Sequence, residues 1–328
     1  ENIHNLRERI IKSENLKQNK NEINKLEREI TIFHSKVVIK ILELINRKID
    51  FIGFHGQTIY HNSLERISRQ IGDGKLLSQL TKKNVIYNFR QNDIKNGGEG
   101  APLAPIFHRL IVKKKKIDLP VCILNIGGIA NVTSINDYDE NSFASRDLGP
   151  GNCLIDEWIR KNTKKNFDNN GEIAKKGKIN NLILNQALDN FDNRPNQIGL
   201  SFDTKDFSLG FVRGLNLEDG AATLTDFTGK VISNGLISFL SKTGEQLNKV
   251  LICGGGRKNL TLLERIKSGS SKNLIVQSID DYGINGDYIE SQAFAYLTIR
   301  SYLNLPISFP KTTGCKKATT GGELVKNY

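Results

Sequence analysis

Short apolar segments that alternate with helical ones constrain the fold of this 328-residue chain more than any other feature. Two apolar, β-rich stretches flank a Gly-Gly pair within residues 121–135, a pattern that is typical of a hairpin. A further apolar run at 250–252 leads into three consecutive glycines, and a helical pattern follows from about Asn259. Elements in this mixed order pack as layered α/β domains.

The length of the chain favours two domains, at about 150 residues for each domain. The lysine-rich stretch at 113–119 indicates a hinge between them. We therefore expect a first domain over residues 1–116 and a second domain over 117–303. Residues 304–328 are expected to return to the first domain.

Hydrophobic periodicity predicts most of the remaining elements. Helices are expected at residues 2–47, 76–82 and 154–159, within 171–193, and at 220–240 and 288–303. Extended segments are expected within 49–59 and at 85–89, and loops at 96–105 and 149–152. The long helix at 220–240 is expected to be capped near Asp219.

Charge and composition limit the class of protein. The formal net charge of +12 favours anionic partners in general, but the lysines are spread along the chain, which fits a solvated basic surface better than a functional patch. No run of about 18 uncharged apolar residues occurs, which excludes a transmembrane helix. The four cysteines form no CxxC pair, so we expect neither a zinc site nor a disulfide framework, and we expect the cytoplasm as location.

Two glycine motifs are candidate anion sites. Gly127 and Gly128 would let backbone amides approach a negatively charged ligand, and an ordinary tight turn is the alternative. Gly254, Gly255 and Gly256 lie between a strand and a helix, which is a common ligand position in α/β domains. A purely structural turn is again the alternative. The second motif lacks the GK[ST] of a Walker loop and the spacing of a dinucleotide fingerprint.

Polar residues suggest catalytic and binding roles. Asp147 precedes a glycine-rich loop, where it could act as a general base or serve as a loop cap. Five further side chains could line a polar pocket: His55, Gln57, Arg90, Asp93 and Glu290. Arg90 and Asp93 could instead pair with each other, and Glu290 could act on the helix dipole without any ligand.

Seven strings that occur in one order are together far more specific than any single motif. They are IDFIGFHGQTIYH (49–61), NFRQNDIKNGGEGAPLAPIFH (88–108), LNIGGIANVT (124–133), DLGPGNCLID (147–156), DGAATLTDFT (219–228), ICGGGRKN (252–259) and GDYIESQAFAYL (286–297). With these strings the chain resembles the anhydro-N-acetylmuramic acid kinases of bacterial cell-wall recycling. The resemblance runs from about residue 26 to the end.

The resemblance implies a fold and an activity. The fold is two ribonuclease-H-like domains of the actin/hexokinase-like ATPase superfamily around an interdomain cleft, with the first domain N-terminally incomplete. The activity is a kinase that uses ATP and Mg²⁺, opens 1,6-anhydro-N-acetylmuramic acid with water and phosphorylates O6. The products are N-acetylmuramic acid 6-phosphate and ADP. The implied partners are this sugar, ATP and a second copy of the chain, with neither nucleic acid nor membrane.

The resemblance also assigns roles to residues. Asp147 matches the catalytic aspartate that activates the attacking water. Gly127 and Gly128 match a phosphate-contacting hairpin. The nucleotide-binding turn is matched by Gly254, Gly255, Gly256 and Asn259. Positions near the sugar are matched by His55, Gln57, Arg90, Asp93 and Glu290. No residue is assigned as a direct metal ligand.

The chain departs from the family pattern at three places. It has no match to the N-terminal phosphate loop of the type GxMSGTSxDGxD and contains no methionine, so we expect its N-terminus to be incomplete and its kinase activity to be weak or absent. Leu148 replaces the usual Thr, and Ser291 replaces the usual Ala. The alternatives are a sensor-type or inactive paralogue, a related sugar kinase, and a basic nucleic-acid-binding protein, although no nucleic-acid-binding motif is present.

Overall fold

The computed structural model describes residues 6, 10, 13–139, 142–194, 201–243, 249–270 and 274–326. The chain divides into two compact units, which are Glu1–Phe107 with Glu290–Tyr328, and His108–Ile289. It passes from one unit to the other within α6 (Pro105–Lys114) and at the start of α12 (Ile289–Tyr302).

The return to the first unit thus comes earlier than the expected position near residue 304, because α12 packs with the first unit. The ring of Phe294 in α12 lies 5.3 Å from the ring of Phe89 and 4.4 Å from that of His55, centroid to centroid. Aromatic pairs at these distances are favourable beyond their buried area.

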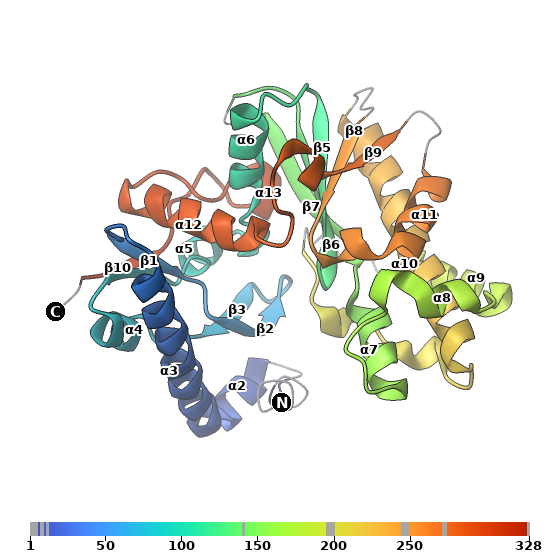
Figure 1. Cartoon of the computed structure of the whole chain (residues 1–328), viewed down its shortest axis with the longest axis horizontal. Coiled ribbons are helices and arrows are strands. Elements are labelled where there is room, and N and C mark those ends of the chain that lie inside the picture. Colours follow the sequence, from blue (N-terminus) through green and yellow to red (C-terminus); the bar gives the residue numbers. More distant parts are fainter. Residues whose placement is uncertain are drawn as a thin grey trace. The chain divides into compact units, whose positions relative to one another are not determined.

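The second unit is built on a five-stranded sheet (Figure 1). Its strands, in spatial order, are β7 (Phe143–Pro150), β6 (Ile129–Ile135), β5 (Val121–Ile126), β8 (Lys249–Cys253) and β9 (Ile275–Ser278). The strand β6 is antiparallel to β5 and β7, whereas β5, β8 and β9 run parallel. This is the strand order of a ribonuclease-H-like core, and it confirms the expected α/β class.

Helices surround this sheet and complete the core of the second unit. All six residues of β5 are buried, as expected for an apolar central strand with both faces covered. The long helix α10 (Leu217–Thr243) packs against β7 and against α7 (Cys153–Asn162). The remaining helical segments are η1 (Asn169–Gly171), α8 (Glu172–Lys176), α9 (Asn181–Asp192), η2 (Thr204–Asp206), η3 (Leu209–Val212), η4 (Gly255–Lys258), α11 (Leu260–Gly269) and η5 (Ile279–Tyr282).

The prediction for α10 needs correction, whereas the one for residues 171–193 holds. The helix α10 begins before Asp219, and Asn216 caps it, because the Asn216 side-chain oxygen accepts a hydrogen bond from the Asp219 amide at 2.8 Å. The helix expected within 171–193 is present as α9, and the short helix α8 precedes it and ends at Gly177, where the backbone is extended.

The first unit combines a small sheet, a hairpin and helices. The sheet pairs β1 (Phe51–Phe54) with β4 (Asn84–Tyr87) in parallel and β10 (Glu323–Val325) with β4 antiparallel. The hairpin is β2 (Gln57–Asn62) and β3 (Ile67–Ile71). The helices of this unit, besides α12, are α2 (Ser13–Gln18), α3 (Lys20–Leu44), α4 (Gly74–Thr81), α5 (Gln91–Lys95) and α13 (Pro310–Thr313).

The helix α3 covers the hairpin, as its apolar spacing predicts. Its residues Ile23, Leu26 and Ile30 are buried in one cluster with Ile59 and Ile71 of the hairpin. None of the helices in the described ranges is long and apolar enough to cross a membrane.

We expect Gly220→Ala to destabilise the second unit. A Cβ at Gly220, in α10, would collide with the ring of Trp158 in α7, and overfilling a packed core typically costs about 1–3 kcal/mol. In a Trp158→Phe background the smaller ring makes room, so the same change should cost less. Denaturant unfolding of the four proteins measures this coupling, and strictly additive costs would contradict the packing.

Candidate active site

The turn that follows β8 lies directly against the end of β5. At Gly254, where φ is +79°, a Cβ would lie 2.5 Å from Asn125 Oδ1 and 2.7 Å from the Ile126 carbonyl oxygen. At Gly256 a Cβ would collide with the Ile126 side chain. Glycine thus lets the backbone at Gly254 approach the backbone of β5, and at Gly256 it leaves room for the Ile126 side chain.

The β5–β6 turn is fixed by the loop after β7. The Gly127 carbonyl accepts hydrogen bonds from the Asn152 amide at 2.8 Å and from the Asn152 side chain at 3.2 Å. The Gly128 carbonyl accepts from the Gly151 amide at 2.9 Å. The carbonyl oxygens of the turn are thus engaged within the protein.

Of the amides in these two turns, Gly127 donates to the Ile129 carbonyl and Gly254 to the Gly286 carbonyl, each at 3.2 Å, whereas the other three have no such partner among the described residues. Within the part of the chain that the structure describes, no residue accepts a hydrogen bond from the N–H of Gly128, Gly255 or Gly256. Unpaired N–H groups at a glycine turn and at the start of a helical segment bind anions. The geometry therefore fits phosphate groups.

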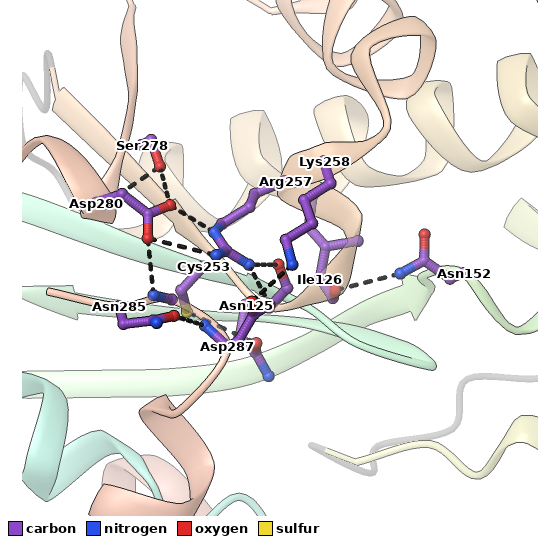
Figure 2. Close-up of polar contacts among 12 residues, drawn as sticks. Asn125, Ile126, Asn152, Cys253, Arg257, Lys258, Ser278, Asp280, Asn285 and Asp287 are labelled. Atoms are coloured by element: carbon purple, nitrogen blue, oxygen red, sulfur yellow. Dashed lines mark hydrogen bonds and ion pairs between the residues drawn. The ribbon is translucent and has the colours of Figure 1, made fainter. Parts of the chain in front are cut away.

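Arg257 and its hydrogen-bond partners hold the turn after β8 in place (Figure 2). Arg257 donates to the Gly254 carbonyl at 3.0 Å, to Asp280 at 2.6 Å and to Asp287 at 2.7 Å. Its hydrogen bonds lower the pKa of both carboxyl groups. Lys258 also donates to Asp287, at 2.6 Å. The guanidinium fork thus connects the turn to residues 278–287 before any ligand binds.

A cavity of about 620 Å³ lies beside this turn. It is lined by Asn152, Asp156, Phe167, Asp168, Asn169, Asn170, Gly255, Lys258, Asn259 and Leu260. The predicted residue Asn259 lies here and caps α11, because its side-chain oxygen accepts from the Leu262 amide at 3.0 Å. The cavity joins a polar surface to the exposed apolar side chains of Phe167 and Leu260, which suits a nucleoside.

Asp147 lies within β7, which continues to Pro150, so the loop expected at 149–152 begins later than predicted. Asp147 stands opposite Asn131 of β6 and is 7% exposed, and one carboxylate oxygen accepts from the Phe202 amide at 2.7 Å. Its neighbour Leu148 is buried in the core and lies against Gly235. A leucine at this position therefore serves packing.

In the first unit, His55 and Arg90 form a pair. The Arg90 Nε–H donates to His55 Nε2 at 3.0 Å, and the other ring nitrogen of His55 donates to the Gly56 carbonyl at 2.9 Å. Burial, and then the charge of Arg90, lower the pKa of His55 to about 3. The imidazole is therefore neutral, and the guanidinium carries the positive charge of the pair.

The other predicted residues of the first unit differ in accessibility. Asp93 is completely buried, and its oxygens accept from the Gly100 amide and from the Thr313 hydroxyl, both at 2.7 Å. It does not pair with Arg90, and it has no surface to offer a ligand. Gln57 and Glu290 are exposed.

The structure therefore assembles two groups of predicted residues. One is the His55–Arg90 pair of the first unit, and the other is the set of glycine turns with Asn259 in the second. Besides Gly255 and Asn259, sequence reasoning missed the cavity residues, because they come from separate segments, and it missed Arg257, although that residue directly follows Gly256. Asn152 could have been found, since it ends the same glycine-rich loop that follows Asp147.

Comparison with known proteins identifies close relatives. Residues 3–327 match the model of the family described as anhydro-N-acetylmuramic acid kinase. A protein of that name from Pelagibacter ubique (strain HTCC1062) is 54% identical over 327 residues, which are 100% of this chain and 87% of the relative. The protein of that name from Zymomonas mobilis subsp. mobilis is 40% identical over 307 residues, 92% and 81% of the two chains.

Among solved structures, an activator of the 2-hydroxyisocaproyl-CoA dehydratase from Clostridium difficile with bound ADPNP shares 17% identity with this chain. The match covers 60% of this chain and 68% of that one, with a TM-score of 0.35.

We expect Gly256→Ala to destabilise the second unit, whereas the matched change Gly255→Ala should be tolerated. A Cβ at Gly256 collides with Ile126, at a typical cost of about 1–3 kcal/mol. A Cβ at Gly255 meets only the side-chain nitrogen Nδ2 of Asn152, at 3.9 Å. Denaturant unfolding compares the two variants, and equal free energies of unfolding would contradict the close approach.

We expect His55 to stay neutral well below its ordinary pKa. Because the folded-state pKa is about 3 and the ordinary value 6.5, the unfolded chain binds the extra proton between these pH values. This group's contribution to stability is therefore complete above pH 6.5 and is lost as the pH falls towards 3.

Imidazole NMR signals measured from pH 8 to pH 5 test this expectation. The signal that disappears in His55→Asn should not move in the wild type. A titration midpoint near the ordinary value would contradict the Arg90–His55 geometry.

Proposed function

Because this chain belongs to the anhydro-N-acetylmuramic acid kinase family, we propose that it opens 1,6-anhydro-N-acetylmuramic acid with water and transfers the γ-phosphoryl group of ATP to O6. The products would be N-acetylmuramic acid 6-phosphate and ADP. The observation that carries the proposal is the set of unpaired amides at Gly128, Gly255 and Gly256 beside the cavity.

The nucleotide would occupy the second unit. Its phosphates would accept hydrogen bonds from the turn amides, and its nucleoside would lie in the cavity beside Phe167 and Leu260. Because Arg257 and the loop after β7 already hold both turns, binding would require little rearrangement. Such preorganisation lowers the cost of binding and of transferring charge.

Mg²⁺ would accompany the nucleotide. Among the described residues, no group of three or more His, Cys, Asp or Glu forms a metal cage. That composition fits an ion held mainly by phosphate oxygens and water, as Mg²⁺ usually is. When bound, the ion would neutralise charge on the transferred phosphoryl group.

Asp147 would act as the general base. Its carboxylate would take a proton from the water that attacks the anomeric carbon, while the bond from that carbon to O6 breaks. The electron pair of that bond stays on O6, which attacks the γ-phosphorus, and ADP leaves. The hydrogen bond from the Phe202 amide fixes the carboxylate in orientation.

The first unit would supply sugar contacts. N-acetylmuramic acid carries a lactyl carboxylate, and Arg90 offers a charged, planar group that suits it. The neutral ring of His55 holds Arg90 through Nε, which leaves the guanidinium fork oriented. We assign Gln57 and Glu290 to the sugar as well, and Asp93 to positioning, since it ties the 97–100 loop to α13.

The expected homodimer and the cytoplasmic location remain predictions, as does the absence of nucleic-acid binding. No observation favours the sensor-type paralogue or a different sugar kinase.

The assignment is tested by incubating the natural gene product that contains these residues with ATP, Mg²⁺ and 1,6-anhydro-N-acetylmuramic acid. ADP release and the mass of the sugar product are followed together. The expected product carries one water and one phosphoryl group more than the substrate. ADP release without a phosphorylated sugar, or no turnover with this substrate, would refute the assignment.

We expect Asp147→Asn to abolish formation of the sugar phosphate while ADP still binds. An amide cannot take the proton of the water, and loss of general base catalysis costs about 10²–10⁴-fold in rate. The matched control is Asp192→Asn, at the exposed end of α9, which should retain turnover. Wild-type turnover in Asp147→Asn would show that another group is the base.

A further inference from the structure

Two carboxylates line the cavity of the second unit, and they differ in whether they are hydrogen-bonded within the protein. This difference indicates how the nucleoside is recognised. The argument rests on the proposed function, because it concerns the nucleotide that the site would bind. One carboxylate belongs to Asp168, in the segment before η1, and the other to Asp156, in α7.

The carboxylate of Asp168 is already used by the fold. One of its oxygens accepts from the Ile173 amide and the other from the Ala174 amide, each at 2.9 Å. The side chain is 4% exposed and holds the first turn of α8. Asp168 therefore has a structural role and little capacity for a ligand.

The carboxylate of Asp156 has no such role. In the described ranges, no side chain or amide donates a hydrogen bond to it, and no cation forms an ion pair with it. The nearby Arg160 donates to the Asn166 carbonyl, and Lys258 pairs with Asp287. Burial raises the pKa of Asp156 to about 6, so the group is ionised at neutral pH. The charge of Arg160 opposes this shift, but among the described residues Asp156 is a half-buried acceptor that lines the cavity without a hydrogen-bond partner.

The position of Asp156 indicates which hydrogen-bond donors of a bound nucleotide it would meet. Its amide bonds to the Asn152 carbonyl at 2.8 Å, so it lies one helical turn, about 6 Å, beyond the residue that contacts the phosphate-binding turn. The next donors after the phosphates are the ribose hydroxyls. Carboxylates accept such hydroxyls in dinucleotide-binding folds, because both oxygens can bond at once.

We propose that Asp156 is a specificity-determining residue that accepts hydrogen bonds from the ribose hydroxyls of the bound nucleotide. The residue thereby selects ribonucleotides over deoxyribonucleotides. The adjacent residue Glu157 offers a matched control. It lies outside the cavity, and its carboxylate is paired with Lys161 at 2.6 Å.

Equilibrium binding by calorimetry tests the proposal on the natural gene product, with ADP, 2′-deoxyADP and 3′-deoxyADP as ligands. The wild type should bind ADP roughly tenfold more tightly than at least one deoxy analogue, since a hydrogen bond to a charged acceptor is lost. In Asp156→Asn and Asp156→Ala that ratio should fall towards one. In Glu157→Gln the ratio should remain that of the wild type.

Two results would overturn the proposal. One is a wild type that binds ADP and both deoxy analogues equally. The other is an Asp156 variant that keeps the discrimination, or that weakens all three ligands by the same factor, as a purely structural defect would. Thermal unfolding of each variant checks that it is folded.

The readout is separate from the kinase assignment, because ADP binding requires no sugar. Selective ADP binding without sugar phosphorylation would refute the proposed function and support this inference. Phosphorylation of the sugar with equal use of ATP, 2′-deoxyATP and 3′-deoxyATP would support the proposed function and refute this inference.

Discussion

The close approach of two backbone segments is the constraint on which the site of the second unit depends. The turn after β8 lies against the end of β5, where the spaces at Gly254 and Gly256 admit no side chain. Since the backbone itself fills the contact, its amides stand at the surface of the site. The same contact joins two parallel strands at their carboxyl ends, where α/β folds place ligands.

Arg257 converts this contact into a fixed structure. Its guanidinium bonds a carbonyl of the turn and two carboxylates at once, and the charges of Asp280 and Asp287 are balanced within the protein. An unpaired cation this close to the turn would itself bind phosphate, whereas the Arg257 guanidinium is paired with two carboxylates. The turn is thus held by an arginine that two carboxylates fix in place, while the Gly255 and Gly256 amides remain available for the anion.

The sequence predicted those features that depend on a local chemical signal. Glycine turns, the apolar hairpin and the start of a helix near Asn259 all follow from properties of neighbouring residues. The strand β7 escaped prediction because it carries Ser145, Arg146 and Asp147, and only its pairing with β6 makes it a strand. The cavity escaped because its lining comes from segments that only the tertiary fold brings together.

Asp93 shows that the sequence does not reveal which carboxylates are already hydrogen-bonded within the protein. Its sequence context suggested a ligand contact, but Thr313, 220 residues away, and the Gly100 amide occupy its oxygens. Asp168 is occupied likewise by amides. An aspartate whose oxygens are both bonded within the protein stabilises the fold. Asp156, whose oxygens are not bonded within the described chain, is the one of the three with capacity left for a ligand.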